Sequence, residues 1–486
     1  MRCSRALAAE PMPRPRPTAR VAATAAVSAY DRFAALGPQS LEALLASGRQ
    51  REMLDEVFGA ESCRELHALA VAAQASRRRH PRQRPRVWIL PGIMGTQLGF
   101  ARRGADPPDA LWLDPPDLID GRAPEMRLRP RDRVRALGVI DQSYLKLRLR
   151  LAAAGFEPEY FAYDWRQGIA RLGAAFATRL RADARPAAIV AHSLGGLVAR
   201  AAMRRAKLPA ISRVVMLGTP NLGSYAAVQA MRGSYAVVRR LAMLDRRHDA
   251  DELTRTVFTT FTSLYDLLPW GAAAAGVDFH EHATWPAQGP GPDPARLAAA
   301  ANPGRLLLPG DERFASIAGI GAPTVTAARA ARREFSYTYR RDGDGTVPLE
   351  SAQLPGASLY VAPVTHSLLP RDDLVGTAVL DLLRDGHTAR LAAGRPRAPA
   401  AALELRDSDL HQALTGKLDW PALTGEQRRH FLENLNDPGP LRPAPSRRGR
   451  ARQSAVEPRP TAPRQPGQGT RRKTRPRSQS RRRDLT

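Results

Sequence analysis

The chain has 486 residues, of which 43% are hydrophobic, so it can bury a large core and one large domain with appendages. It has two cysteines, Cys3 and Cys63, which exclude a disulfide framework and a cysteine-held metal cluster. The sequence has no run of roughly 18 unbroken apolar residues, which excludes a conventional membrane-spanning helix.

The net charge of +27 is unevenly placed along the chain. Residues 441–486 hold fifteen Arg and Lys against Glu457 and Asp484, which gives this segment a charge of +13. Large apolar side chains are sparse there, so we expect a disordered tail that makes peripheral contact with anionic membrane. The tail has no interleaved aromatics, so we expect no sequence-specific nucleic-acid binding. A genome-wide codon bias toward arginine explains the charge equally well.

The N-terminus is arginine-rich and interrupted by prolines, without the continuous apolar stretch of a secretory signal. We therefore expect a cytoplasmic location. Leucine and alanine recur at helical spacing over residues 27–76, which predicts a helical lead-in. A basic, proline-bearing linker completes the predicted N-terminal region, residues 1–85.

From residue 87 onward, strand and helix patterns alternate, which predicts a mostly parallel, doubly wound sheet flanked by helices. Strands are predicted at 87–90, 160–163, 187–191, 213–217, 335–339 and 358–361, and helices at 142–154, 169–182, 195–205 and 372–384. Residues 225–308 lose this alternation and indicate an inserted, mainly helical cap. The predicted core then comprises 86–224 and 309–390, followed by a helical C-terminal appendage (391–440) without strand signals and the tail (441–486).

The clearest local motif is IVAHSLGGLVARAAM, in which a strand runs into Ser193 and a helix follows at once. A serine on so tight a turn needs small neighbours, here Ala191, Gly195 and Gly196. The N–H of Leu194 lies at the start of the helix, where partial positive charge favours a developing oxyanion. These features predict a nucleophile; a simple helix N-cap is the alternative role for Ser193.

A serine hydroxyl needs a base and an orienting carboxylate, which in this kind of site follow in the order Asp, His. Asp344 lies between two glycines after one predicted strand, and His366 follows the next, where a parallel sheet gathers its catalytic loops. We therefore predict a site of Ser193, Asp344 and His366. Asp342 is the alternative to Asp344, and His387 is the alternative to His366.

The glycine-rich loop PGIMGT after the first strand provides a second candidate oxyanion N–H, that of Ile93. We predict no metal and no cofactor. The DGDG segment lacks a further acidic ligand, because Thr346 stands where a calcium loop needs one. The cluster of His280, Glu281 and His282 has no further ligands at metal spacing, so we expect solvated polar surface there.

Five motifs in one order resemble the lecithin:cholesterol acyltransferase family, which includes lysosomal phospholipase and phospholipid:diacylglycerol acyltransferase relatives. They are LPGIMGTQL, ALWLDPPDL, YDWRQ, AHSLGG with LGTPNLGS, and DGDGTVP before VTHS, and they span roughly residues 87–366. The resemblance implies an α/β-hydrolase fold, with the triad and both oxyanion amides at the residues named above.

The resemblance also places the tetrad at residues 163–166 beside the site, where an Asp164–Arg166 pair would brace the loop. The cysteines of secreted animal members are missing, and the lead-in and tail lie outside the match. The implied activity is that of a serine-dependent lipid acyl hydrolase or O-acyltransferase with an acyl-Ser193 intermediate. The triad does not separate hydrolysis from transfer, and hydrolysis is the default.

Apolar cap residues suit the acyl chain of a lipid ester, although they would equally form the cap's own core. They are Phe258, Phe261, Leu264, Tyr265, Leu267, Leu268 and Trp270. An alternative from another class is an anionic-membrane or nucleic-acid binding protein that uses the basic tail on an inactive hydrolase scaffold. The sequence indicates no oligomeric state.

Overall fold

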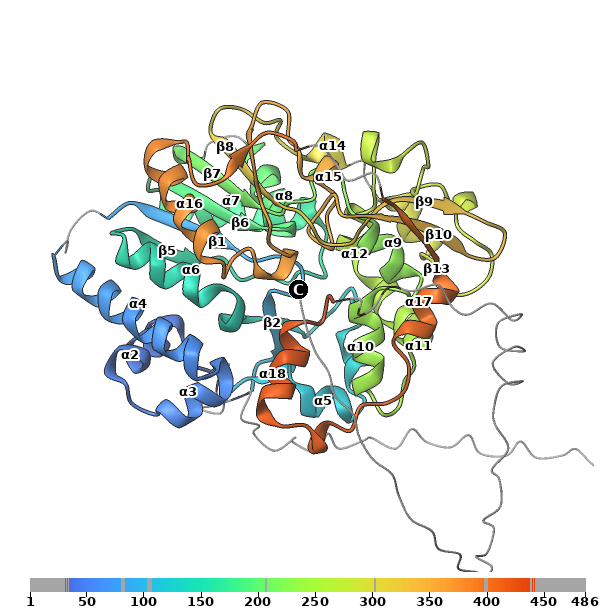
Figure 1. The fold of residues 1–486 in the computed structure, drawn as a ribbon, viewed down its shortest axis with the longest axis horizontal. Coiled ribbons are helices and arrows are strands. Elements are labelled where there is room, and N and C mark those ends of the chain that lie inside the picture. The colour runs from blue at the N-terminus through green and yellow to red at the C-terminus, as the bar shows by residue number, and fades with distance from the viewer. Residues whose placement is uncertain are drawn as a thin grey trace, which may run out of the picture. The chain divides into compact units, whose positions relative to one another are not determined.

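A seven-stranded sheet in the order β12-β11-β8-β7-β6-β1-β5 lies at the centre of the fold (Figure 1). The computed structural model describes residues 31–441 apart from 32, 34, 80–83, 103–106, 206–207, 301–302, 397–400, 438 and 440. The strands are β1 (Arg86–Leu90), β5 (Glu157–Tyr160), β6 (Ala187–His192), β7 (Ile211–Leu217), β8 (Phe314–Gly319), β11 (Ser358–Ala362) and β12 (Ala392–Ala393). All neighbours pair in parallel except β12, which is antiparallel to β11. This is the mostly parallel sheet of an α/β-hydrolase fold, as predicted.

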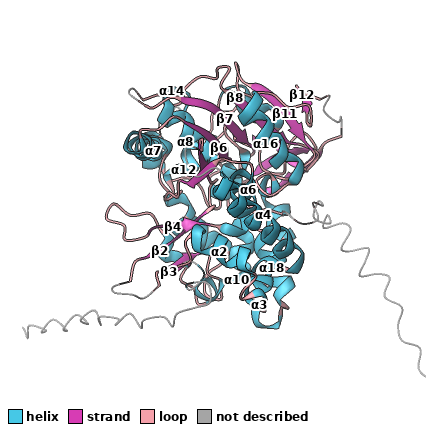
Figure 2. Cartoon of the chain, turned by 90° about the vertical axis from the view of Figure 1, so that its left-hand side faces the viewer, coloured by secondary structure: helices cyan, strands magenta, loops and turns pink. Residues whose placement is uncertain are grey.

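Helices cover both faces of this sheet, so β1, β6 and β8 are buried at every position. Val87 and Ile89 of β1 pack in one apolar cluster with α6 (Asp141–Ala153) and α16 (Asp373–Asp385). Trp88, which lies between them in the strand and points to the opposite face, packs in a second apolar cluster with α7 (Ile169–Asp183) and α8 (Leu194–Met203). Figure 2 shows these two helical layers on either side of the strands.

Two small antiparallel sheets accompany the central one, in the orders β13-β10-β9 and β3-β2-β4. Their strands are β2 (Thr96–Phe100), β3 (Asp109–Trp112), β4 (Arg135–Val139), β9 (Thr324–Ala330), β10 (Phe335–Arg340) and β13 (Leu403–Arg406). The prediction that residues 335–339 belong to the central sheet was therefore wrong. Burial alternates along β10, which is typical of an antiparallel strand with one covered face.

The expectation that strands end after the helix at 372–384 was also wrong, because β12 and β13 follow it. β12 has only two residues, and β13 has one fully buried position among polar neighbours. Strands this short or this polar leave little hydrophobic pattern to detect. β5 likewise lies three residues before its predicted position of 160–163.

The remaining helices belong to the predicted lead-in, cap and appendage, whose boundaries stay a prediction, except for two short helices at residues 115–119 and 349–352, which lie in the predicted core. They are α2 (Pro38–Ser47), α3 (Arg51–Phe58), α4 (Ala60–Arg79), α5 (Pro115–Ile119), α9 (Tyr225–Met231), α10 (Ala236–Leu244), α11 (Ala250–Thr256), α12 (Thr262–Asp266), α13 (Pro294–Ala299), α14 (Pro303–Leu306), α15 (Leu349–Ala352), α17 (Asp407–Ala413) and α18 (Gly425–Glu433). In Figure 1, α18 lies between α3 and α10, although α3 and α18 are far apart in the sequence.

The predicted basic tail lies outside the described residues, apart from Leu441. Among the helices that the structure describes, none combines the length and apolar character needed to span a bilayer.

Candidate active site

A sharp turn between β6 and α8 carries Ser193. Its backbone has φ 54° and ψ −124°, a left-handed conformation that is strained for a residue with a side chain. The Ser193 N–H donates to the Leu217 carbonyl at 2.8 Å, which ties the turn to β7. A Cβ at Gly195 would come 2.6 Å from the Pro91 carbonyl oxygen, so a larger residue there would push the first strand away. The predicted strand, turn and helix are all present around Ser193.

Ser193, His366 and Asp344 form one chain of hydrogen bonds. His366 Nε2 lies 2.9 Å from Ser193 Oγ, and His366 Nδ1 lies 2.7 Å from Asp344 Oδ2. An ionised carboxylate only accepts hydrogen bonds, so Nδ1 carries the imidazole proton and Nε2 accepts the serine hydroxyl. All three residues are buried, with exposures of 5%, 5% and 2%. The structure thus brings the three predicted residues together, in the order that removal of the serine proton requires.

Asp344 reaches this position by a route that the sequence analysis did not anticipate. The preceding strand β10 lies in a small sheet, but the chain then returns to the region after β8, where Asp344 forms an isolated parallel bridge with Ala322. Asp344 Oδ1 accepts the N–H groups of Thr346 at 3.0 Å and Val347 at 2.7 Å. These bonds fix the carboxylate and leave Oδ2 to accept from His366.

The loop after β1 lies against Ser193. A Cβ at Gly92 would come 2.9 Å from Ser193 Cβ, so this close approach requires glycine. Ile93 lines the same cavity as Ser193, and Leu194 is the first residue of α8, where N–H groups have no acceptor within the helix. Of the two residues predicted to supply oxyanion amides, Ile93 therefore lies on the loop beside Ser193 and Leu194 lies at the start of α8. That role stays a prediction.

The tetrad at residues 163–166 supports this loop. The Tyr163 hydroxyl donates to the Pro91 carbonyl, at the start of the loop. The predicted pair is confirmed, because Arg166 donates to both Asp164 oxygens, at 2.8 and 2.9 Å. Arg166 is fully buried and also donates to a backbone carbonyl of the segment before β4. The tetrad thus braces the site from within the protein.

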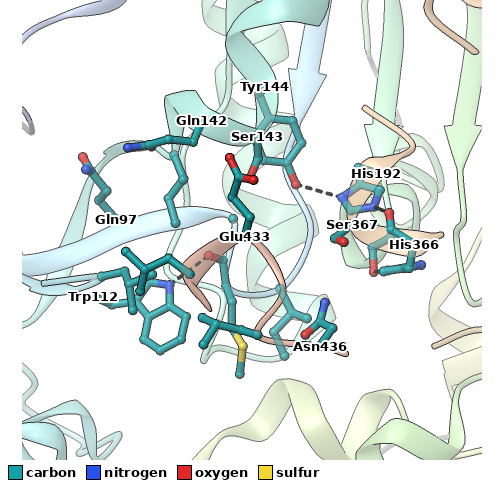
Figure 3. A pocket seen from close by; sticks show the side chains of 18 of the residues that line it. Gln97, Trp112, Gln142, Ser143, Tyr144, His192, His366, Ser367, Glu433 and Asn436 are labelled. Carbon is teal, nitrogen blue, oxygen red and sulfur yellow. Dashed lines mark hydrogen bonds between the residues drawn. The ribbon is translucent and has the colours of Figure 1, made fainter. Parts of the chain in front are cut away.

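Two residues beside the triad, Tyr144 and His192, were not singled out from the sequence. His192 immediately precedes Ser193, and its ring lies between the Tyr144 hydroxyl and the main chain of His366 (Figure 3). Burial, together with the neighbouring His366 imidazole, holds the pKa of His192 well below its usual value. The polar histidine at the end of an otherwise apolar strand is the signal that could have drawn attention to it.

One cavity of about 740 Å³ has Ser193 and His366 in its wall, a size within the usual range for ligand pockets. Core residues that include Ile93, Met94, Trp112 and Ile140 supply part of its apolar lining. The rest comes from the lead-in, the cap and the appendage, with Phe33, Leu36, Met53 and Val57; Val238, Phe258, Leu264 and Leu267; and Trp420, Leu432 and Leu435 among them. Parts of the chain outside the predicted core therefore build much of the wall, which the sequence analysis did not foresee.

The predicted acyl-chain residues of the cap divide into two groups. Phe258, Leu264 and Leu267 line the cavity. The described lining does not include the other four, Phe261, Tyr265, Leu268 and Trp270. The Phe261 ring packs edge-on against Trp165 of the tetrad, with ring centroids 5.5 Å apart. Phe261, Tyr265 and Leu268 belong to the main buried apolar cluster, as the alternative interpretation expected, whereas Trp270 is partly exposed.

The alternative residues lie away from the triad's hydrogen bonds. Asp342 Oδ2 is paired with Arg395 at 3.4 Å. His387 is exposed, with Nδ1 3.2 Å from a backbone carbonyl of its own turn. In the histidine cluster, Glu281 and His282 are exposed and His280 is partly exposed. Over the described ranges, the structure holds no group of three or more His, Cys, Asp or Glu side chains arranged to bind a metal ion.

A sequence model of the lecithin:cholesterol acyltransferase family matches residues 111–289. Among curated proteins, none matches the chain significantly. Similar solved structures include the Bacillus licheniformis lipase BlEst2 in its propeptide form, at 14% identity and a TM-score of 0.34 over 66% of this chain and 54% of the lipase. The matched region thus spans about half the length of that form.

The mature form of the same lipase is 15% identical, with a TM-score of 0.32 over 63% of this chain and 93% of the lipase. The Tle4–Tli4 complex contains a chain 14% identical, with a TM-score of 0.39 over 61% of this chain and 98% of that one. The family match itself covers YDWRQ, AHSLGG and LGTPNLGS, and the loop motif before it and the DGDGTVP motif after it flank the match. The match over residues 111–289 confirms the predicted resemblance to the lecithin:cholesterol acyltransferase family.

Proposed function

We propose that this chain is a serine-dependent lipid acyl hydrolase or O-acyltransferase that works through an acyl-Ser193 intermediate. The family match supports acyl-ester chemistry on lipids in general. The observation that carries the finer proposal is the hydrogen-bond chain from Ser193 Oγ through His366 to Asp344, with links of 2.9 and 2.7 Å. This geometry suits removal of the serine proton during nucleophilic attack.

In the first half of the reaction, Ser193 Oγ attacks the ester carbonyl carbon while His366 Nε2 takes the hydroxyl proton. Asp344 keeps the imidazole in one orientation and stabilises its charged form. The carbonyl oxygen becomes negatively charged and accepts from the N–H groups of Ile93 and Leu194. When the C–O bond to the alcohol breaks, His366 returns the proton to the departing oxygen, and an acyl-Ser193 ester remains.

The second half repeats these steps with a new nucleophile. Water or a second alcohol attacks the acyl-Ser193 carbonyl and gives its proton to His366. The bond to Ser193 Oγ then breaks, and His366 returns the proton to that oxygen. Because the same groups serve both nucleophiles, the product depends on whether the cavity admits an alcohol beside the acyl group. Hydrolysis is the default, because water needs no dedicated binding site.

The cavity supports a substrate with a long acyl chain. Its wall combines Ser193 with apolar side chains from three separate parts of the sequence. Burying an alkyl chain against such a wall contributes about 0.8 kcal/mol for each CH₂ group. A small water-soluble ester would leave most of this surface uncovered.

Labelling with a long-chain fluorophosphonate, followed by peptide mass mapping, tests the nucleophile. We expect the adduct on Ser193 and strongly reduced labelling in a His366→Ala variant. An adduct on another residue would overturn the proposal. Incubation of phospholipid with and without a long-chain alcohol then separates hydrolysis, which releases fatty acid, from transfer, which yields a new ester.

A further inference from the structure

A second chain of buried hydrogen bonds runs beside the triad. The Gly92 N–H donates to Tyr144 Oη at 2.8 Å, Tyr144 Oη lies 2.8 Å from His192 Nδ1, and His192 Nε2 lies 3.0 Å from the His366 carbonyl oxygen. Figure 3 shows the Tyr144 hydroxyl directed at the His192 ring and the ring directed at His366. Tyr144 and His192 are 2% and 8% exposed, so water does not compete for these bonds.

The direction of this chain is fixed by its two ends. The His366 carbonyl can only accept, so His192 Nε2 carries a proton. Burial and the nearby His366 imidazole lower the pKa of His192, which keeps its ring neutral and leaves Nδ1 as an acceptor. Tyr144 therefore donates its hydroxyl proton to Nδ1 and accepts the Gly92 N–H with a lone pair. All three hydrogen bonds therefore run in one direction, from the Gly92 N–H through Tyr144 and His192 to the His366 carbonyl.

The two ends of the chain are the two loops that the reaction needs in place. Gly92 directly precedes Ile93, whose N–H is a proposed oxyanion donor. His366 is the proposed base, and its main chain carries the imidazole. Between them, Tyr144 comes from α6 and His192 from the end of β6, immediately before Ser193. The bonds therefore connect the loop after β1 to the loop after β11, across the nucleophile.

We propose that Tyr144 and His192 are positioning residues that hold the Ile93 amide and the His366 imidazole in a fixed relation to Ser193 Oγ. The inference rests on the proposed function, because it assigns these residues a part in the same reaction. Rate depends steeply on such placement, since an oxyanion donor or base displaced by a fraction of an ångström loses much of its effect. Neither residue exchanges a proton with the substrate in this scheme.

A Tyr144→Phe variant tests the proposal with the smallest change of shape. It leaves the ring in place but deprives the Gly92 N–H and His192 Nδ1 of their partner. We expect kcat to fall about 10- to 100-fold, while KM changes less than about twofold. Tyr337→Phe is the matched control, because the Tyr337 hydroxyl is equally buried and bonded, to Asp407 at 2.7 Å, but lies away from the cavity lining.

Titration of active sites separates positioning from folding. The amplitude of the initial burst of product, or the stoichiometry of fluorophosphonate labelling, counts competent Ser193 sites. A positioning role lowers the rate per site while the amplitude stays full, whereas a merely structural role lowers the amplitude and leaves the rate per site unchanged.

Replacement of His192 supplies the rescue experiment. His192→Leu removes both bonds, and we expect a loss of about 100-fold or more in kcat per site. His192→Gln can direct an amide N–H toward the His366 carbonyl, so we expect it to recover about tenfold relative to His192→Leu. Equal activity of the two variants would show that the bond to His366 is without effect and would overturn the proposal.

Ser193→Ala distinguishes failure of this proposal from failure of the proposed function. If Ser193→Ala is inactive while Tyr144→Phe and His192→Leu keep the wild-type rate per site, only the positioning role is wrong. If Ser193→Ala retains turnover, the acyl-serine mechanism fails, and the positioning role fails with it.

Discussion

The proposed catalytic residues, Ser193, Asp344 and His366, and the apolar wall of the cavity meet at Ser193 but are built in opposite ways. Ser193 and His366 each lie in a short motif at the end of one strand of the central sheet, and Asp344 lies in a short glycine-flanked motif. The wall joins the lead-in to the appendage, which are nearly 400 residues apart in the sequence. Only their packing brings Met53 and Leu432 into one cavity.

This difference suggests that chemistry and substrate choice depend on separate parts of the chain. The family match includes Ser193 but neither the lead-in nor the appendage. A chain could therefore keep its catalytic loops and change its substrate through these outer segments.

The largest expected effect is at the carboxylate. Asp344→Asn removes the acceptor charge that orients His366, and we expect kcat to fall by about 10³- to 10⁴-fold. Asp342→Asn is the matched control two residues away, because Asp342 pairs with Arg395, and we expect its kcat to change by less than about threefold. Initial rates on a soluble short-chain ester provide the measurement. Inactivation by Asp342→Asn alone would reverse the assignment.

The sequence predicted the sheet and most of its helices because parallel strands buried on both faces leave strong apolar runs. It placed Ser193, Asp344 and His366 as candidates because each lies in a motif of distinctive local chemistry. It assigned β10 to the wrong sheet, since strand periodicity does not reveal the pairing partner. The route of Asp344 back to β8 depends on contacts with Ala322 and Gly319 that only the folded chain provides.

The wall could not be predicted for a related reason. Leu432 lies on a short helix of mostly polar residues, and nothing in that pattern indicates a partner in the lead-in. The bonds of Tyr144 and His192 escaped prediction as well, because a tyrosine on a helix and a histidine on a strand are ordinary core residues until their hydroxyl and ring are seen to meet.

A smaller effect is expected at the wall, where tryptophan would fill space that an acyl chain needs. We expect Met53→Trp and Leu432→Trp each to lower kcat/KM about tenfold or more for a 16-carbon ester, but less than about twofold for a 4-carbon ester. Val71→Trp is the control, because Val71 is exposed on α4 and outside the cavity lining. Equal losses on both esters would contradict a role in acyl-chain binding.

The contact between lead-in and appendage should matter less. Arg429 on α18 donates to the carbonyls of Asp55 at 3.4 Å and Glu56 at 2.8 Å, near the end of α3. We expect Arg429→Ala to raise KM for the long ester about threefold to fivefold, since loss of such bonds costs about 1 kcal/mol. Arg384→Ala removes a comparable bond, to the Ala154 carbonyl after α6, and should leave KM unchanged. Similar effects of both variants would indicate general loosening of the fold.

The smallest effect is expected at the junction of cap and core, on stability without loss of activity. Asp266 on α12 accepts the N–H of Ile169, the first residue of α7, at 2.6 Å. Burial raises the pKa of Asp266 to about 6, although the bond from Ile169 opposes this shift. An Asp266→Asn variant keeps an oxygen that can accept from Ile169 but cannot ionise, so it isolates the effect of the charge.

Because its pKa is raised, Asp266 binds its proton more tightly in the folded protein than in the unfolded chain, so the free energy of unfolding depends on pH. Between the ordinary aspartate pKa of 3.8 and about 6, the folded protein keeps the proton on Asp266 while the unfolded chain has lost it. The free energy of unfolding therefore falls as pH rises through this window, by about 3 kcal/mol from this group. Asp266→Asn lacks this contribution, so its melting temperature should match the wild type near pH 4 and exceed it by a few degrees at pH 7. If the difference in melting temperature between the two proteins stayed constant from pH 4 to 7, Asp266 would ionise as freely in the folded protein as in the unfolded chain. The contact between cap and core at this point would then be hydrated.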